Sequence, residues 1–167
     1  MKKLLLTFAV CLAALVSLQA QTVKGSFAAL KNVPRVRLVM DFSAADIHGM
    51  SEEEFAEYEE DWDVDKPDVI ARFMTECNDR CGNTIYVGRY KDSPYEIKLV
   101  VHTISVRGDF DCDAILMDAD GNELGSIIGI REKGGRFGSH LNLIKDGAEH
   151  TGALFGTLLE RAIRKAK

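Results

Sequence analysis

Four segments with strand character follow one another between residues 84 and 132, and this run limits the possible folds more than any other feature. The segments are Thr84–Tyr90, Tyr95–Val106, Cys112–Ala119 and Glu123–Glu132. Residues 91–94 (Lys-Asp-Ser-Pro) and 120–122 (Asp-Gly-Asn) separate the first and the last pair, and both are rich in turn-forming residues. Connections this short can join only antiparallel neighbours. The sequence therefore predicts an antiparallel sheet at the centre of the fold.

A further strand is predicted at Arg35–Phe42, before this run. Apolar residues occupy every second position from Val36 to Phe42, so one face of the strand is expected to be buried. In the long segment Tyr95–Val106, the apolar residues change faces after Val101. A β-bulge or a strong twist near His102 would produce this change.

Two helices are predicted between the first strand and the run of four. Ser51 and Glu54 match a capping box, in which each side chain bonds the backbone amide of the other residue at a helix start. The second helix is expected to begin near residue 65, with Pro67 in its first turn, where the missing amide hydrogen is tolerated. Gly82 is typical of a helix C-terminal end.

A last helix is predicted from about residue 144 to residue 166. Small and apolar residues recur there at helical spacing, so we expect the helix to approach the sheet closely. The element order is β-α-α-β-β-β-β-α, which is typical of an α+β fold. We therefore expect a mainly antiparallel sheet of about five strands packed with helices. Residues 21–167 show no internal repeat and no linker, and they are predicted to form a single domain.

The first twenty residues match a secretory signal peptide. Lys2 and Lys3 precede an uncharged apolar run from Leu4 to Leu18, and Ala20 is a small residue before the expected cleavage at Gln21. The apolar run is shorter than the ~20 residues that a membrane-spanning helix needs, and no second run of that length follows. The sequence predicts an exported protein, periplasmic or secreted, without a transmembrane segment.

The charge balance argues against a nucleic-acid partner. Of the 21 Lys and Arg residues, two leave with the signal peptide, so the mature chain has 19 basic and 26 acidic side chains and a formal charge of −7. Such a surface repels phosphates unless its cations are segregated. The basic residues cluster at the C-terminus, at Arg161, Arg164, Lys165 and Lys167. We interpret them as cations that complement the dipole of the last helix.

The most distinctive surface candidate is the acidic segment Glu52–Asp65, which carries nine carboxylates in fourteen residues. Phe55, Tyr58 and Trp62 recur in it at spacings of three and four, so they share one face of a helix. An exposed face of this kind would dock a basic or carbohydrate partner through its aromatic rings. Alternatively, the rings face the core and the carboxylates are solvated.

Three aspartates suggest a second candidate site. Asp109, Asp111 and Asp113 alternate, so in an extended segment their carboxylates share a face and could bind a divalent cation. The alternative is a solvated strand start. The four histidines lack the short spacings of zinc ligands, and no G-x-S-x-G elbow is present. The sequence therefore predicts no catalytic residue, no metal ligand set and no cofactor.

Two smaller features remain. Cys77, Cys81 and Cys112 stay in the mature chain, and an oxidising compartment permits one disulfide among them. Cys77 and Cys81 lie on an apolar helical stripe, and a bridge from either of them to Cys112 is as plausible as one between them.

The segment 134–139 (Gly-Gly-Arg-Phe-Gly-Ser) is either an anion-binding loop or a mobile connector.

The order of elements resembles that of small cell-envelope domains. These are the N-terminal domain of the translocation protein TolB and the periplasmic domains of curli-secretion and penicillin-binding-protein-activator lipoproteins. The similar segments are Arg35–Phe42 with its following helices, Tyr95–Val106, Ala114–Asp118 with Gly121-Asn122, and Gly152–Ala166. The resemblance implies protein binding or assembly at the envelope, without catalysis.

Taken with the export signal, these features predict a binding or assembly domain whose partner is another envelope or extracellular protein. Two alternatives stay open. One is a hydrolytic or metal-dependent envelope enzyme that uses some of the aspartates and histidines. The other is a secreted effector or inhibitor that acts on another cell's protein.

Overall fold

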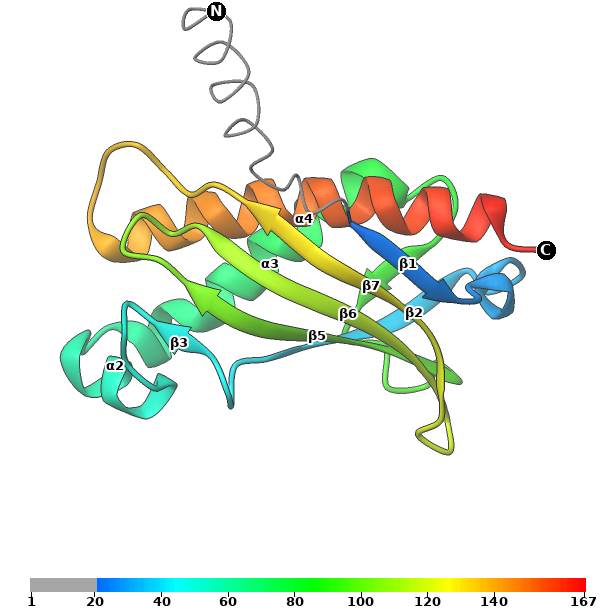
Figure 1. The fold of residues 1–167 in the computed structure, drawn as a ribbon, viewed down its shortest axis with the longest axis horizontal. Helices are drawn as coiled ribbons and strands as arrows, with labels where there is room; N and C mark the ends of the chain where they lie inside the picture. The colour runs from blue at the N-terminus through cyan, green and yellow to red at the C-terminus, as the bar shows by residue number, and fades with distance from the viewer. Residues whose placement is uncertain (1–20) are drawn as a thin grey trace, which may run out of the picture.

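The computed structural model describes residues 21–167, so the predicted signal peptide lies outside the described residues. The chain forms an α+β fold, as predicted (Figure 1). Its elements are β1 (Thr22–Gly25), η1 (Ala28–Leu30), β2 (Arg35–Asp41), β3 (Asp46–Ile47), α2 (Glu52–Tyr58), α3 (Trp62–Cys81), β4 (Tyr86–Gly88), β5 (Tyr95–Ile104), β6 (Phe110–Asp118), β7 (Glu123–Glu132) and α4 (His140–Lys165). None of the described helices is long and apolar enough to cross a membrane.

The sheet differs from the predicted one. It has seven strands in the order β1-β7-β6-β5-β2-β4, with β3 also paired to β5. The strands β1, β7, β6 and β5 pair antiparallel, whereas β2 runs parallel to both β5 and β4. The prediction of a mainly antiparallel sheet of about five strands was therefore wrong.

The physical reason is the crossover through α2 and α3. A connection of that length carries the chain back across one face of the sheet, so the next strand can join its neighbour in parallel. Consequently β4 pairs with β2 and not with β5, although only a short turn separates β4 from β5. The hairpin of β6 and β7 forms as predicted, around a turn in which Gly121 has a φ of 83°.

The helix boundaries show which local signals were sufficient. Ser51 Oγ accepts from the Glu54 amide, and the Glu54 carboxylate accepts from the Ser51 amide, so the predicted capping box starts α2. The helix α3 ends before Gly82 as expected, but it begins at Trp62 instead of near residue 65. Pro67 is therefore its sixth residue and costs one backbone hydrogen bond.

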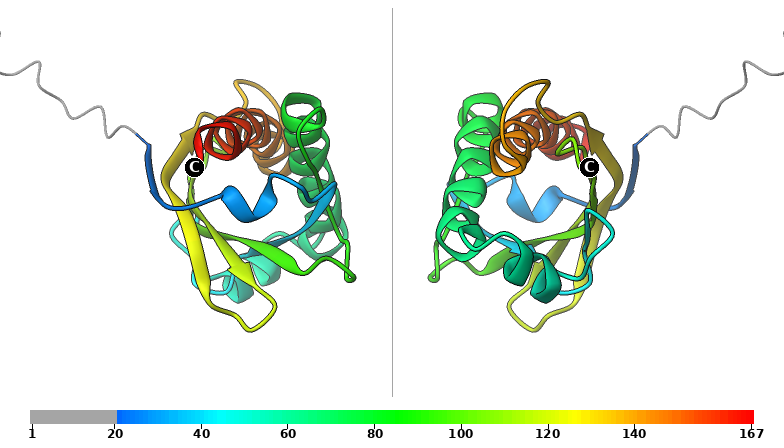
Figure 2. Two further views of the ribbon diagram at one scale, coloured as in Figure 1. Left: turned by 90° about the vertical axis from the view of Figure 1, so that its right-hand side faces the viewer. Right: turned by 90° about the vertical axis from the view of Figure 1, so that its left-hand side faces the viewer.

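The helices α3 and α4 lie side by side over one face of the sheet, and the sheet curls around them (Figure 2). The small residues of α4 face mainly α3, which was not predicted. A Cβ atom at Gly152 would lie 2.2 Å from the carbonyl oxygen of Phe73, and one at Gly156 would lie 2.5 Å from that of Cys77. Both glycines thus permit a helix contact that no larger residue allows.

Irregularities in β5 and β6 shape the uncovered face of the sheet. The pairing of β5 with β6 shifts register between Val101 and Thr103, which confirms the bulge predicted near His102. The pairing of β6 with β7 shifts between Cys112 and Ala114. Bulges re-aim side chains, and these two shifts lie next to the polar residues described below.

Candidate functional site

The predicted aromatic docking face does not exist as a continuous surface. Phe55 and Trp62 are fully buried, and their rings meet edge to face with centroids 5.2 Å apart. The cause is that α2 ends at Tyr58 and Trp62 begins α3, so the three residues do not lie on one helix. Of the three, only Tyr58 is exposed, at 58% of its surface. A binding role for Tyr58 stays a prediction.

Several carboxylates of the acidic segment have partners within the protein. The Lys66 ammonium contacts the Glu52 carboxylate, which also accepts from Trp62 Nε1 at 3.4 Å. Lys145 on α4 reaches Asp65 at 3.0 Å and Asp68 at 3.2 Å. The acidic segment thus joins α2 and α3 to the rest of the fold.

His48 lies in the turn between β3 and α2. Its φ of 59° is in the left-handed region, and its Nε2 atom is buried without a hydrogen-bond partner among the described residues. Its ring meets Phe55 and His140 edge to face, with centroids 4.9 and 5.1 Å away. Burial, together with the nearby charge of His140, lowers the pKa of His48. Protonation of this imidazole is therefore less favourable in the folded protein than in water.

The three predicted aspartates have separate partners. Asp109 accepts from Ser105 Oγ at 2.8 Å and from the Gly134 amide at 2.9 Å, so it fixes turns. Asp111 pairs with Arg131 at 2.9 Å.

Asp113 lies opposite the β5 bulge. It accepts from the Gly129 amide at 2.7 Å, and its Oδ2 lies 3.0 Å from His102 Nε2. Asp111, Asp113 and His102 line one depression of about 380 Å³, whereas Asp109 lies outside it. Within residues 21–167, no group of three or more His, Cys, Asp or Glu could hold a metal ion.

Cys77, Cys81 and Cys112 are all buried. The sulfur atoms of Cys77 and Cys81 lie 3.7 Å apart on α3, and their hydrogen bond raises the pKa of Cys77 and lowers that of Cys81. Cys112 lies on β6, where burial raises its pKa. A disulfide among the three stays a prediction.

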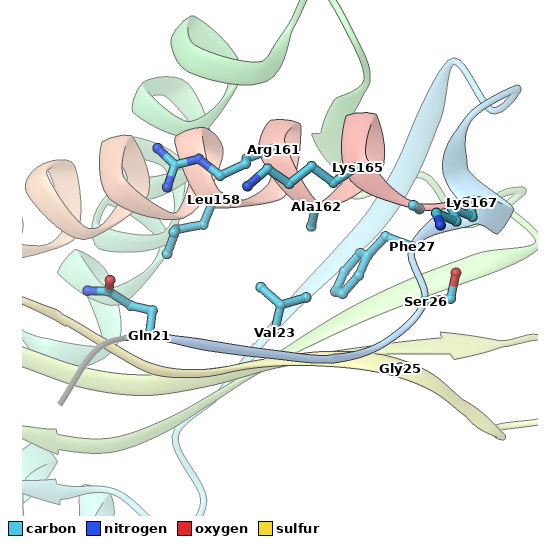
Figure 3. A pocket seen from close by; sticks show the side chains of 11 residues that line it. Gln21, Val23, Gly25, Ser26, Phe27, Leu158, Arg161, Ala162, Lys165 and Lys167 are labelled. Atoms are coloured by element: carbon cyan, nitrogen blue, oxygen red, sulfur yellow. The ribbon is translucent and has the colours of Figure 1, made fainter.

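A groove with an apolar floor lies between β1 and α4. It encloses about 650 Å³, and side chains from both elements face across it (Figure 3). Phe27, Leu158 and Ala162 form its buried floor, while Val23 stands on β1 with 49% of its surface exposed. We call this hollow the β1–α4 groove. Sequence reasoning did not identify it, because the groove exists only where β1 meets the C-terminal part of α4, far away in the sequence.

Three cations line the β1–α4 groove. Arg161, Lys165 and Lys167 are exposed, and none of them has an ion-pair partner among residues 21–167. Arg164, in the same cluster of the sequence, does have one, because it pairs with Glu160 at 2.7 Å. The helix-dipole interpretation therefore accounts for the position of the cluster, but three of its charges form no ion pair with a described residue.

The backbone of β1 adds unpaired polar groups at the same place. Among the strands of residues 21–167, β1 is an edge strand that pairs only with β7. The Ser26 amide donates to Leu124 at 2.9 Å, and hydrogen-bonded pairs alternate with non-bonded pairs along an antiparallel ladder. Counting back from Ser26, the amide and carbonyl groups of Gly25 and Val23 point away from β7, toward the open edge. Both residues line the groove.

Comparisons with known proteins add the following. No protein-family model and no curated protein matches the chain. A PelC dodecamer from Paraburkholderia phytofirmans is 13% identical, with 83% of this chain and 97% of that chain covered and a TM-score of 0.45. A Xanthomonas campestris protein of the DUF330 family is 12% identical, with coverage of 84% and 90% and a TM-score of 0.39. Both likenesses concern the course of the backbone alone, and the groove residues follow from neither.

Proposed function

We propose that this chain is an exported binding domain that holds a partner of the cell envelope or the extracellular space in the β1–α4 groove. The observation that carries the proposal is the combination of an apolar floor with three cations that form no ion pair among residues 21–167. A partner that covers exposed apolar surface and brings opposite charges next to the cations would bind favourably. The predicted signal peptide supplies export, and the resemblance to TolB-like envelope domains agrees with an assembly role.

The chemistry of the groove supports binding over catalysis. Its described lining contains one hydroxyl, from Ser26, and no carboxylate, imidazole or thiol. A hydroxyl nucleophile needs an adjacent general base, and this lining supplies none. The described lining can therefore bind a partner, but it contains no nucleophile with an adjacent general base. An effector or inhibitor would use the same groove, and the identity of its partner would separate it from an assembly protein.

A second candidate function rests on His102 and Asp113. A carboxylate 3.0 Å from an imidazole nitrogen orients the ring, and the other ring nitrogen then becomes a base that could activate water. Of the aspartates and histidines in the enzyme hypothesis, Asp113 and His102 lie within hydrogen-bond distance of each other. Hydrolysis of p-nitrophenyl esters by the wild type but not by a His102→Gln variant would favour it, and equal rates in both would remove it.

The binding proposal is tested with the protein purified after export as bait against an envelope extract. A double variant, Arg161→Glu with Lys165→Glu, reverses two groove charges. Arg89→Glu with Lys91→Glu changes the net charge equally at exposed positions outside the groove. We expect the groove variant to lose a partner that the wild type and the control retain, with equal melting temperatures in all three. Equal capture by all three would contradict the proposal.

A further inference from the structure

We infer that the occupant of the β1–α4 groove is an extended acidic segment of another protein, which joins the open edge of β1 as an eighth strand. The inference rests on the proposed function and names the class of its partner. Three properties of the groove lead to it: the direction of the β1 backbone groups, the apolar floor beside them, and the sign of the charges on α4.

The backbone of β1 favours an extended occupant. The amide and carbonyl groups of Val23 and Gly25 point to the open edge and offer two donors and two acceptors, and the φ of 65° at Gly25 turns the backbone at the end of this strand. Unpaired edges of this kind are templates for an added strand. A fatty acid or a detergent would cover the apolar floor but would leave these groups without partners.

The floor favours alternate apolar side chains. An added strand would continue the sheet over the C-terminal part of α4, so every second side chain would face Leu158 and Ala162. Val23 lies on the β1 side of the same groove, and about half of its surface is exposed. An inward-facing valine or isoleucine in the partner would bury this surface, and the other side chains would remain in water.

The charges favour an acidic partner and disfavour a second copy of this chain. Arg161, Lys165 and Lys167 border the groove, and Lys24 lies on β1 itself. Pairing two β1 edges would bring these cations of both copies together, which costs free energy. The acidic segment at the other end of a second copy is largely helical, so its backbone is already paired and cannot extend a sheet.

The test uses fluorescein-labelled octapeptides of alternating valine and glutamate, with binding to the exported protein followed by fluorescence anisotropy. One control peptide carries lysine in place of glutamate. Two further controls are N-methylated, one at the valine amides and one at the glutamate amides, so each lacks the donors of one edge while the charges stay. We expect the unmodified valine–glutamate peptide to bind, the lysine peptide not to bind, and one of the two N-methylated peptides to bind much more weakly than the other. NaCl at about 0.5 M should weaken binding through screening. Lys165→Glu should weaken it by about tenfold or more, and Arg89→Glu with Lys91→Glu should leave it unchanged.

Two results would overturn the inference. Equal binding of both N-methylated forms, with the methyl groups on either edge, would show that no strand is added. Binding of laurate at the groove, detected by its loss in the Lys165→Glu variant and without any peptide binding, would identify the site as one for an anionic amphiphile. In that case the proposed function survives if the groove variant still loses its partner from the extract. If no partner from the extract depends on the groove, both proposals fail.

Discussion

The two ends of the molecule differ in how many of their charged side chains form ion pairs. At the end that carries α2, the acidic segment contributes ion pairs to Lys66 and Lys145, and Phe55 and Trp62 are packed in the core. At the other end, near the C-terminus (Figure 1), three cations form no ion pair within residues 21–167 and Val23 is half exposed. The acidic end is conspicuous in the sequence, whereas the groove end is inconspicuous there. The region with the dense pattern of charged and aromatic residues is therefore the one whose charges form more ion pairs and whose rings are more deeply buried.

The largest effect expected from this difference is on stability at the α2 end. Trp62→Ala removes a fully buried ring in contact with Phe42 and Phe55, and it should lower the free energy of unfolding by about 3–5 kcal/mol. Urea denaturation followed by circular dichroism measures the loss. Val23→Ala is the comparison at the groove end, where a half-exposed side chain should cost far less. A Trp62→Ala variant as stable as the wild type would restore the idea of an exposed aromatic face.

A smaller loss is expected at the start of α2. Ser51→Ala removes the side chain that accepts from the Glu54 amide and frees the reciprocal partner, and this should cost about 1 kcal/mol. The same denaturation experiment detects it. Ser51→Asp keeps an acceptor at the N-cap and should retain most of the stability. If both variants unfold like the wild type, the capping box does not anchor this end.

The pH dependence at His48 should be smaller still. Because burial and His140 lower the pKa of His48 in the folded state, the unfolded state binds a proton more readily. The stabilisation is complete above the ordinary pKa of 6.5 and decreases as the pH falls through 6.5 toward the lowered value. His48→Asn keeps a residue that tolerates the left-handed conformation. Its free energy of unfolding should change less between pH 7.5 and pH 5 than that of the wild type, and an unchanged slope would remove His48 as the cause.

The smallest effect on stability is expected at the groove. Arg161 and Lys165 are exposed and have no ion-pair partner among the described residues, so their replacement by glutamine, which places no negative charge at the C-terminal end of α4, should change the free energy of unfolding by no more than about 0.5 kcal/mol. Thermal melting of the double variant provides the measurement. A large loss would mean that these cations stabilise the end of α4, and that they are not available for a partner.

Local signals predicted part of this fold, and long-range pairing explains the rest. The capping box at Ser51, the bulge near His102 and the turn before Glu123 depend on neighbouring residues, and all three are present. The parallel insertion of β2 between β5 and β4 depends on which strands meet after two helices, and no local pattern encodes that choice.

The candidate site was missed for the same reason. The cations of α4 were visible in the sequence as a cluster, but their lack of partners depends on what lies beside them. Val23 belongs to a strand of four residues and lies about 140 positions from Lys165, so only the folded chain brings the two to one groove. The acidic segment, by contrast, was conspicuous because all of its residues are neighbours in the sequence.

The most direct test compares the two ends in one experiment. The photo-reactive residue p-benzoylphenylalanine is placed at Val23 or at Tyr58 of the exported protein, which is irradiated in an envelope extract and examined for cross-linked products. A partner in the β1–α4 groove predicts a product from position 23 that disappears in the Arg161→Glu, Lys165→Glu background, and none from position 58. A product from position 58 alone would contradict the account and return the binding site to the acidic end.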